Sequence, residues 1–321
     1  MTAALHVLQA GIHTTVQDMG RTGCRAIGVP VSGALDATAL RLANLVAGNE
    51  PDCAGLEMLY SGATLEVVRG SARIAVACAD ATIESARGGT RELSAWHSAT
   101  LRSGERLRIR TIARTAAAYV AVEGGFALAP RLGSLSTYTP GRLGGMEGHA
   151  LRARDELPLC LAAPRERAER HLSSAPILRV PGTVRVLLGP QADRFDEQSI
   201  ERFLNAQYKV TPASNRTGLR LEGPSLQHEN DYDLLSEGVV DGSIQVPGSG
   251  QPVVLIADHP TVGGYPKIAT AISADIAAIG RLRIGSTVRF GAVDESLAAS
   301  ARKEEDAWFD SVRASMRECE S

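Results

Sequence analysis

The chain has 321 residues, of which 34 are basic and 36 are acidic, so its formal net charge is −2. This small charge, without a basic stripe interleaved with aromatic residues, argues against nucleic acid as a partner. No run approaches the roughly 18 consecutive apolar residues of a membrane-spanning helix. The first residues also lack the charged start and apolar centre of a signal peptide. We therefore expect a cytoplasmic protein with no membrane contact.

The cysteines and histidines give no sign of a metal site. The five cysteines are scattered along the chain, without the close pairs that a zinc site uses. The seven histidines show no ligand spacing of the kind found on a helix. We expect reduced cysteines and no bound metal.

The N-terminal part begins with a predicted strand over residues 5–12, followed by a polar loop. His13, Gln17 and Asp18 could hydrogen-bond a ligand or a partner, but Asp18 before Gly20 is also typical of a plain turn, and both interpretations stay open. Asp36 is a good N-cap for the helix that follows, and the sequence predicts that this helix stops at residues 48–51.

Short strands separated by glycine-rich turns then dominate the pattern. Residues 65–68, 73–79 and 106–111 are typical of an antiparallel barrel or sandwich. The polar, proline-bounded stretch 162–180 is the predicted linker, and strands resume at 184–188. We therefore expect a mainly β fold with a few helices (α+β), divided into an N-terminal domain 1–161, the linker, a domain 181–293 and a helical tail 294–321.

Three similarities in the same order indicate that the two halves are related. Residues 74–80 align with 252–258, residues 101–109 align with 282–290, and the helix after Asp36 aligns with one after Asp196. The sequence thus predicts two β-barrel-like halves. The first copy lacks the Tyr-Pro-Lys that follows the second copy's paired glycines, so the second half is the one expected to bind a ligand.

The stretch with the most candidate functional residues lies after the predicted buried strand 252–257. Asp258 and His259 leave the end of this strand, Gly263 and Gly264 allow positive φ, and the chain continues through residues 265–267 (YPK). Two adjacent glycines can turn successive N–H groups toward an anion, while Lys267 adds a charge and Tyr265 adds a flat face. An ordinary hairpin with a surface lysine explains the same pattern.

The choice of lysine at this place is itself informative. Of the 34 basic residues only Lys209, Lys267 and Lys303 are lysines, so the chain generally uses arginine where it needs only solubility. Carboxylates and amides at other predicted strand ends, Glu222, Glu237 and Gln245, could converge with Asp258 and Lys267 at one barrel mouth, flanked by Arg216 and Arg220. Carboxylates beside a lysine could transfer protons around an amide, although Glu237 and Arg220 could equally form a structural ion pair.

Several motifs together resemble the biotin-dependent carboxyltransferase/KipI-antagonist family, which includes the C subunit of the bacterial 5-oxoprolinase and the carboxyltransferase half of urea amidolyase. The resemblance covers about residues 5 to 292. The motifs that carry it are 11–18 (GIHTTVQD), 28–36 (GVPVSGALD), 41–49 (RLANLVAGN), 189–195 (GPQADRF), 220–224 (RLEGP), 236–240 (SEGVV), 243–247 (SIQVP) and 263–269 (GGYPKIA).

The resemblance implies a cyclophilin-like barrel in the second half and a role in a complex that opens 5-oxoproline to L-glutamate with ATP hydrolysis. Its implied partners are a KipI-like B subunit, together with a LamB/YcsF-like A subunit. The chain has no phosphate-binding loop motif, so ATP would be consumed by the complex without a recognisable cofactor motif in this chain. The alternatives are a biotin-dependent carboxyltransferase acting on urea or a related amide, and a non-catalytic regulator that binds a KipI-like kinase inhibitor.

Within that family we expect three catalytic residues, Asp258, Lys267 and Glu237. Asp258 or Glu237 would transfer a proton, and Lys267 with the glycine amides would bind the substrate carboxylate or a phosphoryl group. The expected substrate-binding residues are Gln245, Gly263, Gly264, Tyr265, Arg216, Arg220, Glu222 and His259.

Overall fold

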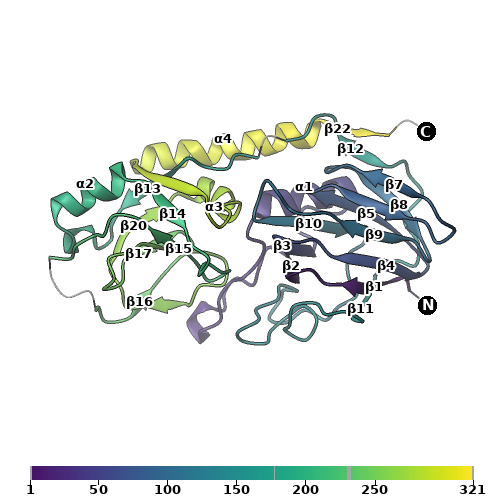
Figure 1. Cartoon of the computed structure of the whole chain (residues 1–321), viewed down its shortest axis with the longest axis horizontal. Coiled ribbons are helices and arrows are strands. Elements are labelled where there is room, and N and C mark those ends of the chain that lie inside the picture. Colours follow the sequence, from purple (N-terminus) through teal and green to yellow (C-terminus); the bar gives the residue numbers. More distant parts are fainter. Residues whose placement is uncertain (1, 177, 230–232, 320–321) are drawn as a thin grey trace. The chain divides into compact units, whose positions relative to one another are not determined.

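A computed structural model describes residues 2–176, 178–229 and 233–319 of the chain (Figure 1). By its internal contacts the chain divides into two compact units. The first comprises Met1–Arg21, Ser32–Ile177 and Phe309–Ser321, and the second comprises Thr22–Val31 and Leu178–Trp308. The predicted mainly β fold with a few helices is confirmed, because strands outnumber helices in both units.

The first unit is built from two antiparallel sheets. One has the strand order β11-β1-β4-β9-β6-β7 and the other has the order β2-β3-β10-β5-β8. The strands of the first sheet are β1 (Ala4–Gln9), β4 (Thr64–Arg69), β6 (Ala81–Glu84), β7 (Thr90–Leu93), β9 (Arg106–Ile109) and β11 (Glu156–Pro158). Those of the second are β2 (His13–Gln17), β3 (Gly55–Leu59), β5 (Ser71–Ala77), β8 (Ser98–Arg102) and β10 (Ala117–Val122).

Alternation along β4 and β9 gives the first sheet one core face and one outer face. Leu65 and Val67 on β4 and Leu107 and Ile109 on β9 are buried in the core, while the residues between them are partly or fully exposed. The central strand β10 of the second sheet is buried along its whole length, and α1 (Ala37–Ala47) packs against it. The core therefore lies between the two sheets and under α1.

Helix α1 begins and ends where the sequence predicts. The Asp36 side chain accepts a hydrogen bond from the Ala39 N–H, and Gly48 closes the helix in the left-handed conformation with φ 89°. Asn44 of this helix is buried, and its amide donates to the carbonyls of Pro51 and Cys53. Its role is to hold the turn after the helix.

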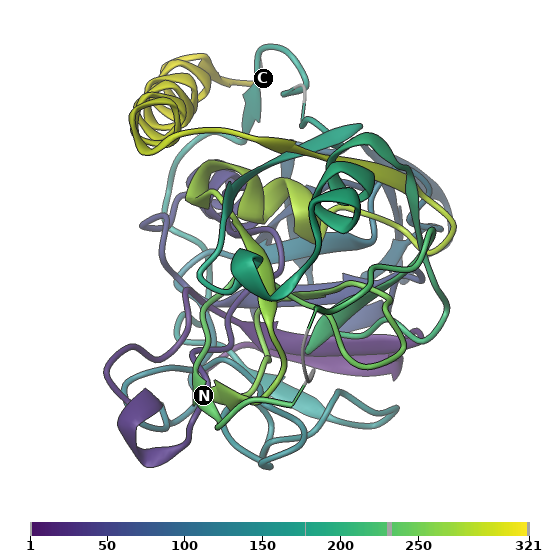
Figure 2. The same cartoon turned by 90° about the vertical axis from the view of Figure 1, so that its left-hand side faces the viewer.

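The second unit contains a closed barrel with the strand order β13-β20-β17-β18-β15-β14-β21. Figure 1 labels β13, β14, β15, β17 and β20, and Figure 2 turns the same green strands toward the viewer. Its strands are β13 (Thr183–Leu188), β14 (Tyr208–Val210), β15 (Gly218–Glu222), β17 (Ser243–Gln245), β18 (Val253–Leu255), β20 (Lys267–Ala271) and β21 (Thr287–Ala292). Strand β13 pairs with β21 in parallel and with β20 in antiparallel orientation. A two-stranded sheet of β16 (Glu237–Gly238) and β19 (Val262–Gly263) belongs to the same unit.

Helices α2 (Glu197–Asn205) and α3 (Ser273–Gly280) accompany the barrel. Asp196 caps α2 by accepting from the Ser199 N–H, as the sequence indicated. Phe203 of α2 stacks on Phe290 of β21, with ring centroids 4.5 Å apart, and this contact fixes the helix on the barrel.

The similarity between the halves is weaker in the structure than in the sequence. Helices α1 and α2 both follow an aspartate cap. However, residues 101–109 contribute to β8 and β9, which belong to different sheets of the first unit, whereas residues 282–286 precede β21 without forming a strand. The closed barrel is found in the second unit, whereas the described strands of the first unit form two larger sheets and one two-stranded sheet.

Three segments differ from the predicted domain plan. The predicted linker contains β12 (Arg170–Leu172), which pairs with β22 (Met316–Glu318) near the end of the chain. The predicted tail is mostly one helix, α4 (Glu295–Ala314), and Trp308 and Phe309 fall on different sides of the boundary between the units. Residues 22–31 belong to the second unit, where the Arg25 guanidinium donates to the Val239 carbonyl.

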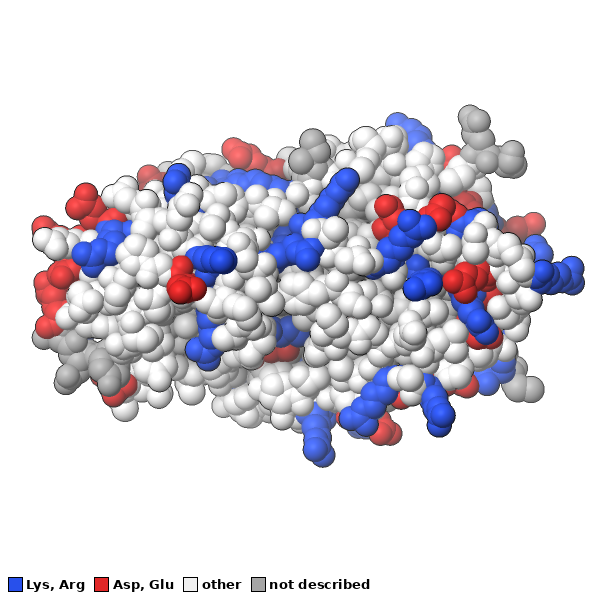
Figure 3. All heavy atoms as spheres, in the orientation of Figure 1, with Lys and Arg blue, Asp and Glu red and all other residues white. Residues whose placement is uncertain are grey.

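Charges of both signs occur on the face drawn in Figure 3. In the part of the chain that the structure describes, no helix is both long enough and apolar enough to span a membrane.

Candidate functional site

Lys267 is the first residue of β20 and lies opposite Gln245 of β17. The residue is only 3% exposed, which is unusual because lysine is almost never buried without a partner. Its ammonium donates a hydrogen bond to Oε1 of Glu237. The Glu237 side chain is 46% exposed, so a buried cation is neutralised by a carboxylate that reaches it from the protein surface.

Gln191 fixes both partners of this ion pair. Its N–H donates to the Lys267 carbonyl at 3.1 Å, and its side-chain oxygen accepts from the Lys267 N–H at 3.1 Å. Its amide nitrogen also donates to the same Glu237 oxygen that Lys267 contacts. The hydrogen bond from Lys267 is the main reason that the pKa of Glu237 lies below its usual value, so the carboxylate stays ionised near neutral pH.

Gly263 and Gly264 do not form the predicted anion-binding nest. Neither has φ in the left-handed region. Gly263 lies in β19 and pairs with Glu237 of β16, and the Gly264 carbonyl accepts from the Leu234 N–H at 2.8 Å. Local sequence could not separate these conformations because glycine adopts both with little cost.

The absence of a side chain at Gly263 serves close packing instead. A Cβ at this position would lie 2.5 Å from Nε2 of Gln245. Gln245 is 6% exposed, and its amide donates to the Tyr265 carbonyl at 3.3 Å. Tyr265 itself is 40% exposed. The contacts described above thus bring five of the candidate residues together: Lys267, Glu237, Gln245, Gly263 and Tyr265.

Asp258 and Arg216 form a separate, buried ion pair. The guanidinium donates to both carboxylate oxygens, at 2.7 and 3.1 Å, and the two side chains are 3% and 6% exposed. His259 is also buried, with one ring nitrogen 3.1 Å from Asp241 Oδ1 and the other 2.5 Å from the Pro260 carbonyl oxygen.

The strand register places these two groups at opposite ends of β17. Gln245, at the end of β17, pairs with Lys267, while the Gly242 N–H, just before β17, donates to the carbonyl of Leu255 at the end of β18. Asp258 follows Leu255 by three residues. Asp258 and Lys267 therefore have different ion-pair partners, Arg216 and Glu237 respectively.

Arg220 and Glu222 are not brought into either group. They alternate with the buried Leu219 and Leu221 along β15, and both are exposed. This alternation turns their side chains to the outside of the barrel, so the expectation that they converge with Lys267 is wrong. The alternative ion pair of Glu237 with Arg220 is not formed either, since Glu237 contacts Lys267.

In the N-terminal loop, Asp18 serves as a hydrogen-bond centre of the first unit. It accepts from the Gly20 N–H at 2.8 Å, as the turn interpretation expects, and also from the hydroxyls of Ser134 and Ser136 and the N–H of Leu135. Burial raises the pKa of Asp18, but these four hydrogen bonds outweigh it and hold the pKa below its usual value. This arrangement ties the loop to the glycine-rich segment after residue 133.

Among the described residues, no group of three or more His, Cys, Asp or Glu side chains is arranged to hold a metal ion. The Lys267 group, which comprises Lys267, Glu237, Gln191 and Gln245, offers a buried ammonium, an ionised carboxylate and two amides. Such donors can bind a carboxylate or phosphate and orient an amide.

Comparison with known proteins decides the family. Residues 27–292 match the carboxyltransferase domain, subdomain A and B. The chain belongs to this carboxyltransferase domain family. The sequence resemblance is thereby confirmed.

Its relatives include proteins of similar length. The chain is 33% identical to the 5-oxoprolinase C subunit of Escherichia coli and 31% identical to that of Haemophilus influenzae, and each match covers 96% of this chain and 97% of the relative. Among solved structures, the Kluyveromyces lactis urea carboxylase is 29% identical with a TM-score of 0.87 over 99% of this chain, which spans 30% of that protein.

Gln191 is the residue of this group that sequence reasoning missed. The sequence could have indicated Gln191 as a site residue, since it lies in the motif 189–195 (GPQADRF) that supports the family resemblance. Its contact with Lys267 depends on the pairing of β13 with β20, which brings residues 76 positions apart together.

Proposed function

We propose that this chain is the C-type subunit of an ATP-dependent 5-oxoprolinase and works with subunits of the A and B types to open 5-oxoproline to L-glutamate. The two curated 5-oxoprolinase subunits match it along nearly their whole length. The urea amidolyase of Saccharomyces cerevisiae also matches, but this chain spans only 17% of it. The identity of 33% to the first of these subunits, against 28% to the urea amidolyase, favours the 5-oxoprolinase reaction.

The buried Lys267 ammonium is the single observation that carries the role of the site. In the structure it is occupied by the carboxylate of Glu237, which is half exposed and can turn toward water. A small substrate carrying its own carboxylate can replace Glu237 at the ammonium, because the same charge and hydrogen-bond geometry suit both. 5-Oxoproline has such a carboxylate beside its lactam.

The remaining residues have supporting roles in this proposal. The Gln245 amide, next to Gly263, is placed to orient the lactam, and Gly264 and Tyr265 shape the same edge. ATP would transfer its γ-phosphoryl group to the lactam oxygen and leave as ADP. Once displaced, Glu237 is free to accept the proton released when water adds to the lactam carbonyl carbon. The ring C–N bond then breaks, its nitrogen takes up a proton, and a second water releases phosphate to leave the new carboxylate of glutamate. Asp258 and His259 hold Arg216 and Asp241 at the other end of β17.

A second candidate is carboxyl transfer from a biotin carrier to urea or another amide nitrogen. The family model and the likeness to urea carboxylase favour it. The same Lys267 group would then hold the carboxylate being transferred. A non-catalytic regulator of a KipI-like inhibitor is the outcome expected if neither reaction occurs.

The experiment is reconstitution with the A-type and B-type partners, followed by measurement of phosphate and glutamate release. The proposal expects ATP hydrolysis that depends on 5-oxoproline and on this chain. Carboxylation of urea with a biotinylated carrier, without lactam hydrolysis, would support the second candidate. Binding to the B-type partner without either activity would overturn both.

A further inference from the structure

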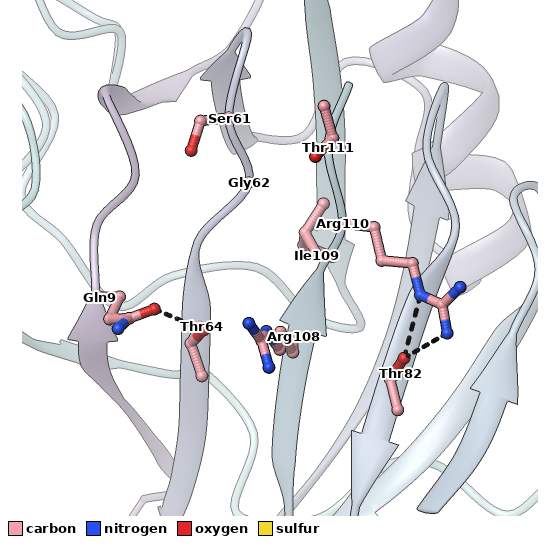
Figure 4. Close-up of a pocket in the computed structure, with 9 residues that line it drawn as sticks. All are labelled: Gln9, Ser61, Gly62, Thr64, Thr82, Arg108, Ile109, Arg110 and Thr111. Atoms are coloured by element: carbon pink, nitrogen blue, oxygen red, sulfur yellow. Dashed lines mark hydrogen bonds between the residues drawn. The ribbon is translucent and has the colours of Figure 1, made fainter. Parts of the chain in front are cut away.

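A polar cavity of about 510 Å³ lies on the first unit, far in sequence from the Lys267 group (Figure 4). It opens on the outer face of the sheet that contains β1, β4, β9 and β6. Its size is within the range of small-molecule sites. Its lining includes two arginines, Arg108 and Arg110, and no carboxylate.

The register of the sheet places Arg108 at the centre of a cross-strand row. Thr64 lies directly opposite Arg108 on β4, and Thr82 lies directly opposite it on β6. Gln9 of β1 continues the row beyond Thr64. Figure 4 shows Arg108 between the two threonines. A guanidinium is thus flanked on both sides by neutral hydroxyls.

In the neighbouring cross-strand row on the same face, the charge of the arginine is neutralised by carboxylates. Arg106, two residues before Arg108, lies opposite Glu66 and Glu84, and its guanidinium is 3.1 Å from the Glu66 carboxylate. By contrast, no hydrogen bond or ion pair among the described residues involves the Arg108 guanidinium. Opposite charges across strands stabilise a sheet. Arg108 faces threonines where Arg106 faces glutamates, so its positive charge is left for a ligand to neutralise.

Arg110 lies at the rim of the cavity and orients the Thr82 hydroxyl. It donates to the Thr82 hydroxyl oxygen at 3.3 and 3.1 Å and to Glu92 at 2.6 Å. Glu92 neutralises the charge of Arg110, and the Thr82 oxygen acts as an acceptor. The hydrogen of the Thr82 hydroxyl is then available to donate into the cavity.

The floor of the cavity is closely packed. Ile109 is 4% exposed, and a Cβ at Gly62 would lie 2.5 Å from Ile109. A bridge between Ser61 and Thr111 closes the end beyond Gly62. Thr82 thus supplies a hydroxyl beside the Arg108 guanidinium, while the Thr64 hydroxyl on the other side donates to Oε1 of Gln9 at 3.5 Å.

We propose that this cavity binds the phosphate group of a small organic phosphate. A tetrahedral oxyanion has several oxygens, which suit one guanidinium and a ring of hydroxyls approaching from different strands. The cavity is large enough for the phosphate and a small organic group attached to it.

The test measures binding of inorganic phosphate and of phenyl phosphate to the full chain by calorimetry, with acetate as a carboxylate comparison. Saturable phosphate binding is expected, with acetate weaker. Arg108→Gln should weaken phosphate binding by about tenfold or more, in line with the loss of a charge-assisted hydrogen bond. Arg106→Gln is the matched control on the same strand and face and should change it by less than about twofold.

Both arginines are exposed, so neither substitution should impair folding, and thermal unfolding checks this. In the unsubstituted chain, phosphate should also shift the NMR resonances of Thr64 and Thr82 saturably. Absence of saturable binding to the unsubstituted chain would overturn the proposal. Equal weakening by Arg106→Gln and Arg108→Gln would also overturn it, because it would indicate general attraction to a basic surface. Preference for acetate over phosphate would contradict the ligand class.

Discussion

The Lys267 ammonium is buried and donates a hydrogen bond to the Glu237 carboxylate, which is 46% exposed. Burial of a cation is unfavourable unless the charge is paired, so this pair indicates a position built for an anion. Glu237 fills the position in the chain alone. In the proposed complex, the substrate carboxylate takes its place.

Glu237→Gln should therefore tighten binding of 5-oxoproline to the reconstituted complex. The neutral amide competes less well than a carboxylate for the ammonium, so KM should fall several-fold while kcat falls if Glu237 also accepts the proton. Steady-state kinetics measure both constants. Glu222→Gln, on the outside of β15, is the control and should leave both unchanged. A KM that rises for Glu237→Gln would contradict competition between Glu237 and the substrate.

Asp258→Asn should destabilise the second unit. The substitution leaves the buried Arg216 guanidinium without its charged partner, which typically costs about 3–5 kcal/mol. Denaturant unfolding measures the loss. Asp310→Asn, at an exposed position of α4, is the control and should change the free energy of unfolding by less than about 0.5 kcal/mol. If Asp258→Asn is as stable as the control, the pair is not structural.

Stability should depend on pH through Asp18. Its pKa is lowered in the folded chain from an ordinary value of 3.8, so its stabilising contribution is complete above that value and is lost as pH falls through the lower folded pKa. The melting temperature of the unsubstituted chain should exceed that of Asp18→Asn at pH about 6, and the difference should shrink toward pH about 3. A difference that is constant across this range would show that ionisation of Asp18 is not what stabilises the loop.

Gly263→Ala should disturb Gln245 without unfolding the barrel. The added Cβ would meet the Gln245 amide, and that side chain must then leave the Tyr265 carbonyl. We expect a stability loss of about 1 kcal/mol and a clear fall in activity of the complex. Gly238→Ala is the matched control on the paired strand, because a Cβ there would contact nothing within 4 Å. Equal activities of the two variants would exclude a role for Gln245 in the site.

Much of the local structure could be predicted because it depends on neighbours in sequence. The caps at Asp36 and Asp196 and the buried strand before Asp258 follow from a few adjacent residues. The family, too, was identifiable from short motifs.

Pairing of distant residues was harder to predict. Whether Lys267 and Asp258 share a pocket depends on the register of β17 with β18 and β20, and no local pattern specifies it. The alternation of β15 already indicated that Arg220 and Glu222 share a face, but not that this face is outside the barrel. The chain passes between the two units at residues 22–31 and after Trp308. The amino-acid composition does not indicate either place.

The most direct test of the central claim replaces the buried lysine in the reconstituted complex. Lys267→Met removes the charge, and Lys303→Met makes the same change at an exposed position of α4. We predict that kcat/KM for 5-oxoproline-dependent ATP hydrolysis falls at least about a hundredfold for Lys267→Met and is unchanged for Lys303→Met. Full activity of a folded Lys267→Met complex would contradict the proposed role of the buried ammonium.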